Sequence, residues 1–136
     1  RFYVMQNKFH LIFIIGFSLL LLQCSGDGRL HRKLVEMADN LNKYVPAQLD
    51  DHTIFLGADV TEGNVFQYRY QLVNTAEPQS MLRAVEEQTK NNIREALRLN
   101  PDLKIFTENE VKIDYIYTDS AGNILKIIHI TPEDYK

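Results

Sequence analysis

The chain of 136 residues has little cysteine, no tryptophan and fewer basic than acidic side chains. Its one cysteine, Cys24, excludes an internal disulfide, so packing alone has to hold the core. Lysine and arginine number 15 against 18 acidic residues. A negatively charged domain is a poor candidate for sequence-independent binding of nucleic acid, so we expect no nucleic-acid partner. Seven tyrosines, among segments rich in isoleucine and valine, favour a half-exposed sheet.

The first long apolar run is typical of an export signal. Lys8 supplies a short positive region, and residues 9–22 are almost wholly apolar. Such a run is shorter than the roughly 20 residues that an ordinary membrane-spanning helix needs. We therefore interpret residues 1–23 as a signal peptide, in which residues 1–4 precede a plausible initiator, Met5.

The signal closes with Leu21-Leu22-Gln23-Cys24, which resembles the lipobox of bacterial lipoproteins. The resemblance implies that Cys24 becomes the first mature residue and is lipidated, because a diacylglycerol donor can alkylate a thiol. Each CH₂ of an acyl chain that is buried in the membrane contributes about 0.8 kcal/mol to membrane binding, and stable anchoring takes more than one acyl chain. Gln23 departs from the pattern, in which Gly, Ala or Ser usually precedes the cysteine. An uncleaved signal anchor, or cleavage by the ordinary signal peptidase near Ser25-Gly26, stays open.

The pattern of residues 24–136 predicts a short tether followed by a single domain. Residues 24–29 form a short flexible tether, and residues 30–136 fit one domain. Without Arg1 and Lys8, 13 basic and 18 acidic side chains remain, a net charge of −5. We expect an exported protein, anchored to a bacterial membrane by its lipid and facing the periplasm or the cell surface.

Apolar periodicity divides the domain into two helices and two hairpins. The expected elements are a helix over 30–43, strands over 53–61 and 65–73, a helix over 77–99, and strands over 111–118 and 124–131. Gly63-Asn64 and Gly122-Asn123 provide hairpin turns. The order α-β-β-α-β-β predicts an α+β domain with a four-stranded antiparallel sheet and the helices packed on one face. The last strand has isoleucines on both sides, so a central strand and an edge strand both stay open.

Two stretches carry a further resemblance: LNKYVPAQLDDHTIFLGADVTEGNVFQYRYQLVN, residues 41–74, and VKIDYIYTDSAGNILKIIHITPEDY, residues 111–135. They resemble a group of small exported bacterial domains of unknown function. The shared motifs are structural, namely the hairpins, the turns and the closing ITPEDY. Members of the group often carry two cysteines, whose positions are held here by Arg98 and Tyr135, so the resemblance implies a disulfide that this chain lacks. The group supports the fold and export but implies no activity.

Polar clusters with metal-ligand chemistry do not converge in the sequence. Asp50-Asp51-His52 contains ordinary ligand groups, but neighbouring side chains of an extended chain point in opposite directions, so we favour a polar loop. Residues 119–123 resemble a calcium loop only faintly, because an apolar strand replaces the downstream glutamate. We expect a hairpin turn there, and we expect no metal and no cofactor.

Catalytic chemistry has no candidate set either. His129 lies among isoleucines and has no partner nearby in the sequence. Ser80 and Ser120 lie in cap and turn contexts without a nucleophile motif. We therefore assign no catalytic residue and expect that the protein is not an enzyme.

Four tyrosines, Tyr68, Tyr70, Tyr115 and Tyr117, occupy paired positions in the two predicted hairpins. Because they alternate with polar residues, we favour the interpretation that all four face the helices and belong to the core. If the tyrosines of one hairpin face outward instead, they form an aromatic binding surface. Tyrosine suits that task, since it offers a large contact area with few rotatable bonds.

Together these features predict a small membrane-anchored envelope domain that binds another molecule and performs no chemistry. Besides the membrane, the expected partner is another envelope protein. Two alternatives stay open. One is an assembly or chaperone lipoprotein of a larger envelope complex, and the other is an immunity or inhibitor protein that blocks a toxin or hydrolase.

Overall fold

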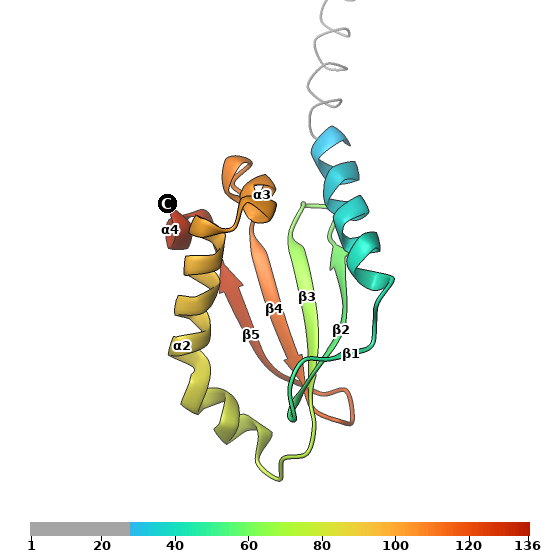
Figure 1. Ribbon diagram of the computed structural model, residues 1–136, viewed down its shortest axis with the longest axis vertical. Helices are drawn as coiled ribbons and strands as arrows, with labels where there is room; N and C mark the ends of the chain where they lie inside the picture. Colours follow the sequence, from blue (N-terminus) through green and yellow to red (C-terminus); the bar gives the residue numbers. More distant parts are fainter. Residues whose placement is uncertain (1–27) are drawn as a thin grey trace, which may run out of the picture. The chain divides into compact units, whose positions relative to one another are not determined.

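The computed structural model describes residues 28–136 (Figure 1). The signal peptide and the lipidation predicted at Cys24 lie outside the described residues. Among the described residues, Leu34–Lys136 form one compact unit, which contains the sheet, and the chain before Leu34 belongs to a separate unit. Within residues 28–136, none of the helices combines the length and the apolarity that crossing a bilayer requires.

The first described element is a helix over residues 28–42, which continues into the second unit from Leu34 onward. Leu34 and Ala38 are one turn apart and are both buried. Asn42, in the last turn, bonds to the main chain of Ala58 through both atoms of its side-chain amide. Its Nδ2 donates to the Ala58 carbonyl at 2.8 Å, and its Oδ1 accepts from the Ala58 N–H at 2.7 Å.

Five strands form one sheet in the order β1-β2-β3-β4-β5. Their bounds are Ala47–Gln48 for β1, Thr53–Val60 for β2, Phe66–Leu72 for β3, Ile113–Thr118 for β4 and Ile124–Ile130 for β5. All neighbouring pairs are antiparallel except β3 and β4, which are parallel. The predicted α+β class is confirmed, but the predicted four-stranded antiparallel sheet is wrong on two counts.

Both errors have a physical reason. β1 contains two residues, too few for a periodic pattern to be recognised. The parallel pair arises from α2, Pro78–Leu99, because this helix returns the chain along the sheet before β4 begins. Figure 1 shows α2 running beside the sheet between the end of β3 and the start of β4.

Three short helical segments complete the fold: η1 over Pro101–Leu103, α3 over Lys104–Glu108 and α4 over Pro132–Tyr135. α4 begins with a capping box, in which Thr131 and Asp134 satisfy each other's main-chain N–H groups. Tyr135 is buried, and its hydroxyl donates to the carbonyls of Val111, at 2.9 Å, and Phe106, at 3.3 Å. The last residues of the chain are therefore held against the core.

The core lies on the face of the sheet that α2 covers. Its fully buried side chains are Phe66, Phe106, Leu34, Ile113 and Ile130. The last strand of the chain, whose position the sequence left open, is an edge strand. This position agrees with its burial, since Ile128 and Ile130 are buried whereas Ile124 is 59% exposed.

Candidate binding groove

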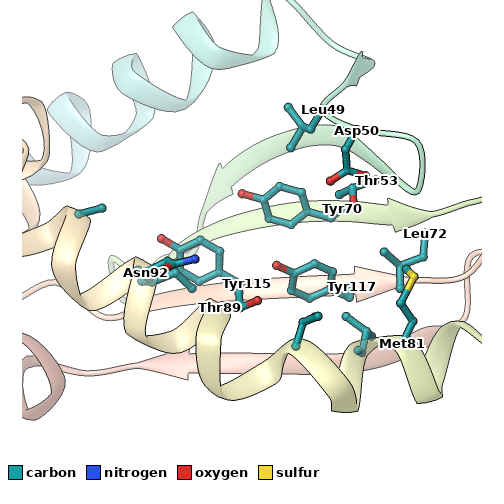
Figure 2. Close-up of a pocket in the computed structure, with 14 residues that line it drawn as sticks. Leu49, Asp50, Thr53, Tyr70, Leu72, Met81, Thr89, Asn92, Tyr115 and Tyr117 are labelled. Carbon is teal, nitrogen blue, oxygen red and sulfur yellow. The ribbon is translucent and has the colours of Figure 1, made fainter.

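A groove of about 430 Å³ opens between α2 and the sheet (Figure 2). This volume falls in the range of about 300–1,000 Å³ that is usual for ligand pockets. We call it the tyrosine groove. Its sheet side is formed mainly by Tyr70, Leu72, Tyr115 and Tyr117, its helix side by Met81, Leu82, Val85, Thr89, Asn92, Ile93 and Ala96, and its lip by Leu49, Asp50 and Thr53.

The helix side of the groove follows from the spacing of α2. One face of the helix carries side chains that recur at three- and four-residue steps: Met81, Val85, Thr89, Asn92 and Ala96. Val85 nevertheless remains 46% exposed, although it is apolar and faces the sheet. The groove is thus an unfilled part of the interface between α2 and the sheet.

The floor of the groove belongs to a ladder of stacked tyrosines. The parallel register of β3 and β4 sets Tyr68 beside Tyr115 and Tyr70 beside Tyr117. The ring centroids of the first pair lie 4.9 Å apart and those of the second pair 5.1 Å apart. In both pairs the angle between the two ring planes is 18°. Offset stacking of this kind contributes about 0.5–1.5 kcal/mol per pair beyond burial. All four tyrosines lie on the face toward α2, and their use as a binding surface stays a prediction.

Burial raises the pKa of all four tyrosine hydroxyls of the ladder above the ordinary value of 10. Neighbouring tyrosines add to the rise in the pKa of Tyr68, Tyr70 and Tyr115, and the charge of Asp50 adds to that of Tyr117. The phenols are therefore neutral near physiological pH. Figure 2 shows the hydroxyls of Tyr70, Tyr115 and Tyr117 pointing along the groove toward the end that holds Asn92.

The Asp50-Asp51-His52 stretch forms the polar loop that the sequence predicts. The Nδ1 atom of His52 lies 3.2 Å from the Val73 carbonyl, and the Asp51 carbonyl accepts from Asn74, so these groups serve the main chain of the loop. In the part of the chain that the structure describes, no cluster of three His, Cys, Asp or Glu side chains could hold a metal ion.

Residues 119–123 form the predicted hairpin turn. The Oδ1 atom of Asp119 accepts from the main-chain N–H groups of Ala121 and Asn123, each at 2.9 Å. The main-chain bond from Asn123 is the largest of several hydrogen bonds that hold the pKa of Asp119 below its ordinary value. The carboxylate therefore closes its own turn.

His129 has a partner that sequence reasoning missed. Its Nδ1 atom lies 2.7 Å from the Oδ1 atom of Asp114, directly across the β4–β5 pair. Further polar contacts extend this pair into a row across the sheet. Gln67 donates to Asp114 at 3.2 Å, and Arg69 contacts Asp59 at 2.8 Å. Gln67, Arg69 and Asp114 alternate with the tyrosines along β3 and β4, so this polar row lies on the opposite face of the sheet from the tyrosine groove. Only the strand register could have revealed the pair.

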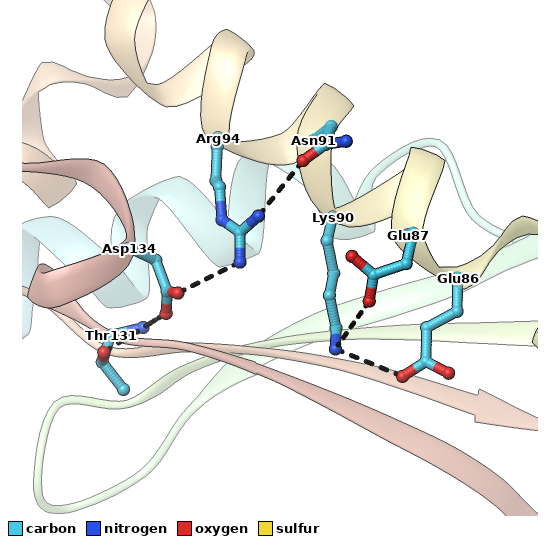
Figure 3. Close-up of polar contacts among 7 residues, drawn as sticks. All are labelled: Glu86, Glu87, Lys90, Asn91, Arg94, Thr131 and Asp134. Carbon is cyan, nitrogen blue, oxygen red and sulfur yellow. Dashed lines mark hydrogen bonds and ion pairs between the residues drawn. The ribbon is translucent and has the colours of Figure 1, made fainter.

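Polar contacts join α2 to the last residues of the chain (Figure 3). Arg94 pairs with Asp134 at 3.3 Å, and the main-chain N–H of Thr131 donates to Asp134. The Thr131 bond is the largest cause that lowers the pKa of Asp134. Arg98 and Tyr135, at which the sequence resemblance places the cysteines of the group, belong to the same two helices. An ion pair thus connects α2 to α4 in this chain.

Residues 29–126 match the family model described as Domain of unknown function (DUF8479). Among solved structures, the chain is similar to PA3611 of Pseudomonas aeruginosa, which is assigned as a secreted protein. The identity is 13%, the TM-score is 0.69, and the match covers 81% of this chain and 96% of that chain. No curated protein matches the chain.

Two pilotins also share the fold. EpsS, from the type 2 secretion system of Vibrio vulnificus, matches at 13% identity with a TM-score of 0.53, covering 80% of this chain and 97% of its own. AspS, a type II secretion system pilotin of Vibrio cholerae, matches at 15% identity with a TM-score of 0.58, covering 82% of this chain and 97% of its own. At these identities the likeness shows the fold alone.

Proposed function

The chain belongs to the family described as Domain of unknown function (DUF8479), and from this premise we propose that it is an exported, membrane-anchored envelope protein without catalytic activity. In this proposal the tyrosine groove binds a segment of a partner protein. The observation that carries it is the groove itself, an open apolar recess with a floor of stacked tyrosines.

Exposed apolar side chains at the groove supply the driving force. Val85, within the groove, is 46% exposed, and Leu49, at its lip, is 59% exposed. Covering such surface contributes about 25 cal/mol per Å² removed from water. The tyrosines add large, rigid contact area at a small cost in side-chain entropy. A partner segment that places apolar side chains against α2 and the ladder would therefore be held.

The fold supports one of the two alternative functions more than the other. Two of the solved proteins that share it are pilotins of type 2 secretion systems. We propose, as a second candidate, that the partner is a component of an envelope complex and that this protein serves the assembly of that complex. The immunity or inhibitor alternative rests on the sequence prediction alone.

The groove can be tested by photocrosslinking in cells that produce the intact chain. A photoreactive residue replaces Val85 in one variant and Gln71 in the other, because Gln71 alternates with the tyrosines and serves as the control for the opposite face. We expect one envelope protein to be crosslinked from position 85 and not from position 71. In a binding assay with the purified partner, Val85→Gln should weaken the complex. Equal crosslinking from both faces would refute the groove as the site.

The anchor needs a separate test. Mass spectrometry of the native protein should find acyl groups on Cys24, and Cys24→Ala should release the protein from the membrane fraction. An N-terminus without lipid in a soluble fraction would contradict anchoring. A partner that is recovered with wild type and lost with Cys24→Ala would show that location is needed for the encounter.

A further inference from the structure

The tyrosine groove has a single charge at its lip. Of the residues that line it, only Asp50 carries a charge near neutral pH, while Thr53, Thr89, Asn92 and the tyrosine hydroxyls are neutral polar groups. Figure 2 shows Asp50 and Leu49 at the margin above Tyr70. The apolar side chains and the carboxylate are therefore within reach of one bound segment.

Asp50 is held in a defined position. Its Oδ1 atom accepts from the main-chain N–H of His52 at 2.8 Å, and its own carbonyl accepts from Gln48 at 3.2 Å. The Leu49 N–H donates to the Thr53 carbonyl at 2.9 Å and closes the loop that carries Asp50. The His52 bond is the largest cause that lowers the pKa of Asp50, so the carboxylate is ionised at neutral pH.

The charge of Asp50 also acts on the groove floor. After burial, it is the next cause that raises the pKa of Tyr117. None of the residues that line the groove carries a positive charge, so no cation in the lining opposes this local field. An anionic segment would meet repulsion at the lip, whereas a cation placed there would meet a fixed, ionised partner.

Resting on the proposed function, we infer that the tyrosine groove selects a protein segment with aliphatic side chains on one side and a lysine or arginine placed against Asp50. The aliphatic side chains enter the space beside Met81 and Val85. The cation stays at the partly solvated lip, where Asp50 decides between basic and acidic segments. Asp50 is thus a specificity-determining residue of the groove.

The test uses two synthetic peptides of equal length with leucine at the same positions. The remaining positions are lysine in one peptide and glutamate in the other. Affinity is measured by calorimetry for wild type, Asp50→Asn, Asp51→Asn and Val85→Gln. In Asp50→Asn, the asparagine keeps the acceptor for the His52 N–H. Asp51→Asn is the matched control, because it removes the same charge from the next residue, whose side chain does not line the groove.

We expect wild type to prefer the lysine peptide, and Asp50→Asn to weaken its binding about fivefold, the upper end for an exposed ion pair. Asp51→Asn should stay within about twofold, and added salt should reduce the preference of wild type. Val85→Gln should weaken both peptides. Equal binding of both peptides, or no binding of either, would overturn the inference, as would equal effects of Asp50→Asn and Asp51→Asn. Crosslinking from position 85 then decides the proposed function independently.

Discussion

The contact between Asn42 and Ala58 predicts an unusual response to the isosteric change Asn42→Asp. The Asn42 amide donates to the Ala58 carbonyl and accepts from its N–H, and Ala58 is only 6% exposed. An ionised carboxylate keeps the acceptor but sets a second oxygen against the carbonyl oxygen. At neutral pH the Ala58 carbonyl then loses its donor.

The magnitude follows from that one lost donor. An unsatisfied buried carbonyl costs about 1–3 kcal/mol, and solvent at the exposed side chain of residue 42 moves the expected cost to about 1–2 kcal/mol. With a urea dependence of about 1–2 kcal/mol per molar, the unfolding midpoint should fall by about 1 M. Asn40→Asp, in the same last turn of the helix, brings the same charge to the helix end at an exposed side chain whose hydrogen bond is to Lys43 and not to β2, so it controls for the helix dipole.

Protonation should reverse the loss. The neutral carboxyl can donate to the Ala58 carbonyl, so folding favours the neutral form and raises the pKa of the introduced group. The stability that the neutral carboxyl contributes is present at pH below its unfolded-state pKa of about 4, and it is lost as pH rises through its folded-state pKa. Urea unfolding at about pH 3 should therefore bring Asn42→Asp within about 0.5 kcal/mol of Asn40→Asp. A gap between these two variants that is the same at both pH values would refute the reasoning.

Three further predictions concern stability. Tyr135→Phe removes a hydroxyl that bonds two main-chain carbonyls and should cost about 1–2 kcal/mol in urea unfolding, whereas Tyr44→Phe, at a side chain of a residue that is 79% exposed, should cost less than about 0.5 kcal/mol. Gly57→Ala should cost about 1–3 kcal/mol, because Gly57 has a φ of +140° and an added Cβ would lie 2.8 Å from Oδ1 of Asn42; an unchanged midpoint would contradict this. Main-chain hydrogen bonding lowers the pKa of Asp134. The stability that its carboxylate contributes is therefore present at pH above the ordinary pKa of about 4 and is lost as pH falls through the folded-state pKa. In thermal unfolding, the melting temperature of Asp134→Asn should decline less steeply in acid than that of wild type.

Local patterns predicted most of the elements. The helix expected over 77–99 forms over Pro78–Leu99, and the strand expected over 65–73 forms over Phe66–Leu72. These segments are long enough for apolar periodicity to identify them. The Gly122-Asn123 turn was predictable for a different reason, because its residue types suit a hairpin. The short helix α4 was not, since the pattern predicted no element after the strand over residues 124–131.

Long-range geometry was beyond the sequence patterns. The residues of each hairpin predict that hairpin alone. The relative direction of β3 and β4 depends instead on where α2 returns the chain. The same limit applies to the site. The stacking of Tyr68 on Tyr115 requires the parallel register, and the pairing of His129 with Asp114 requires the register of β4 and β5. The sequence could supply the tyrosines as candidates but not the groove that three of them line.

The stacked tyrosines have an optical consequence. The chain has seven tyrosines and no tryptophan, so its near-ultraviolet signal is free of indole bands. Four of the tyrosines hold their rings at fixed angles, with neighbouring centroids 4.9 to 6.5 Å apart. Chromophores ordered in this way give a circular dichroism band that depends on their mutual orientation. A guest that tilts even one ring changes that band, so the unlabelled protein reports when its recess is occupied.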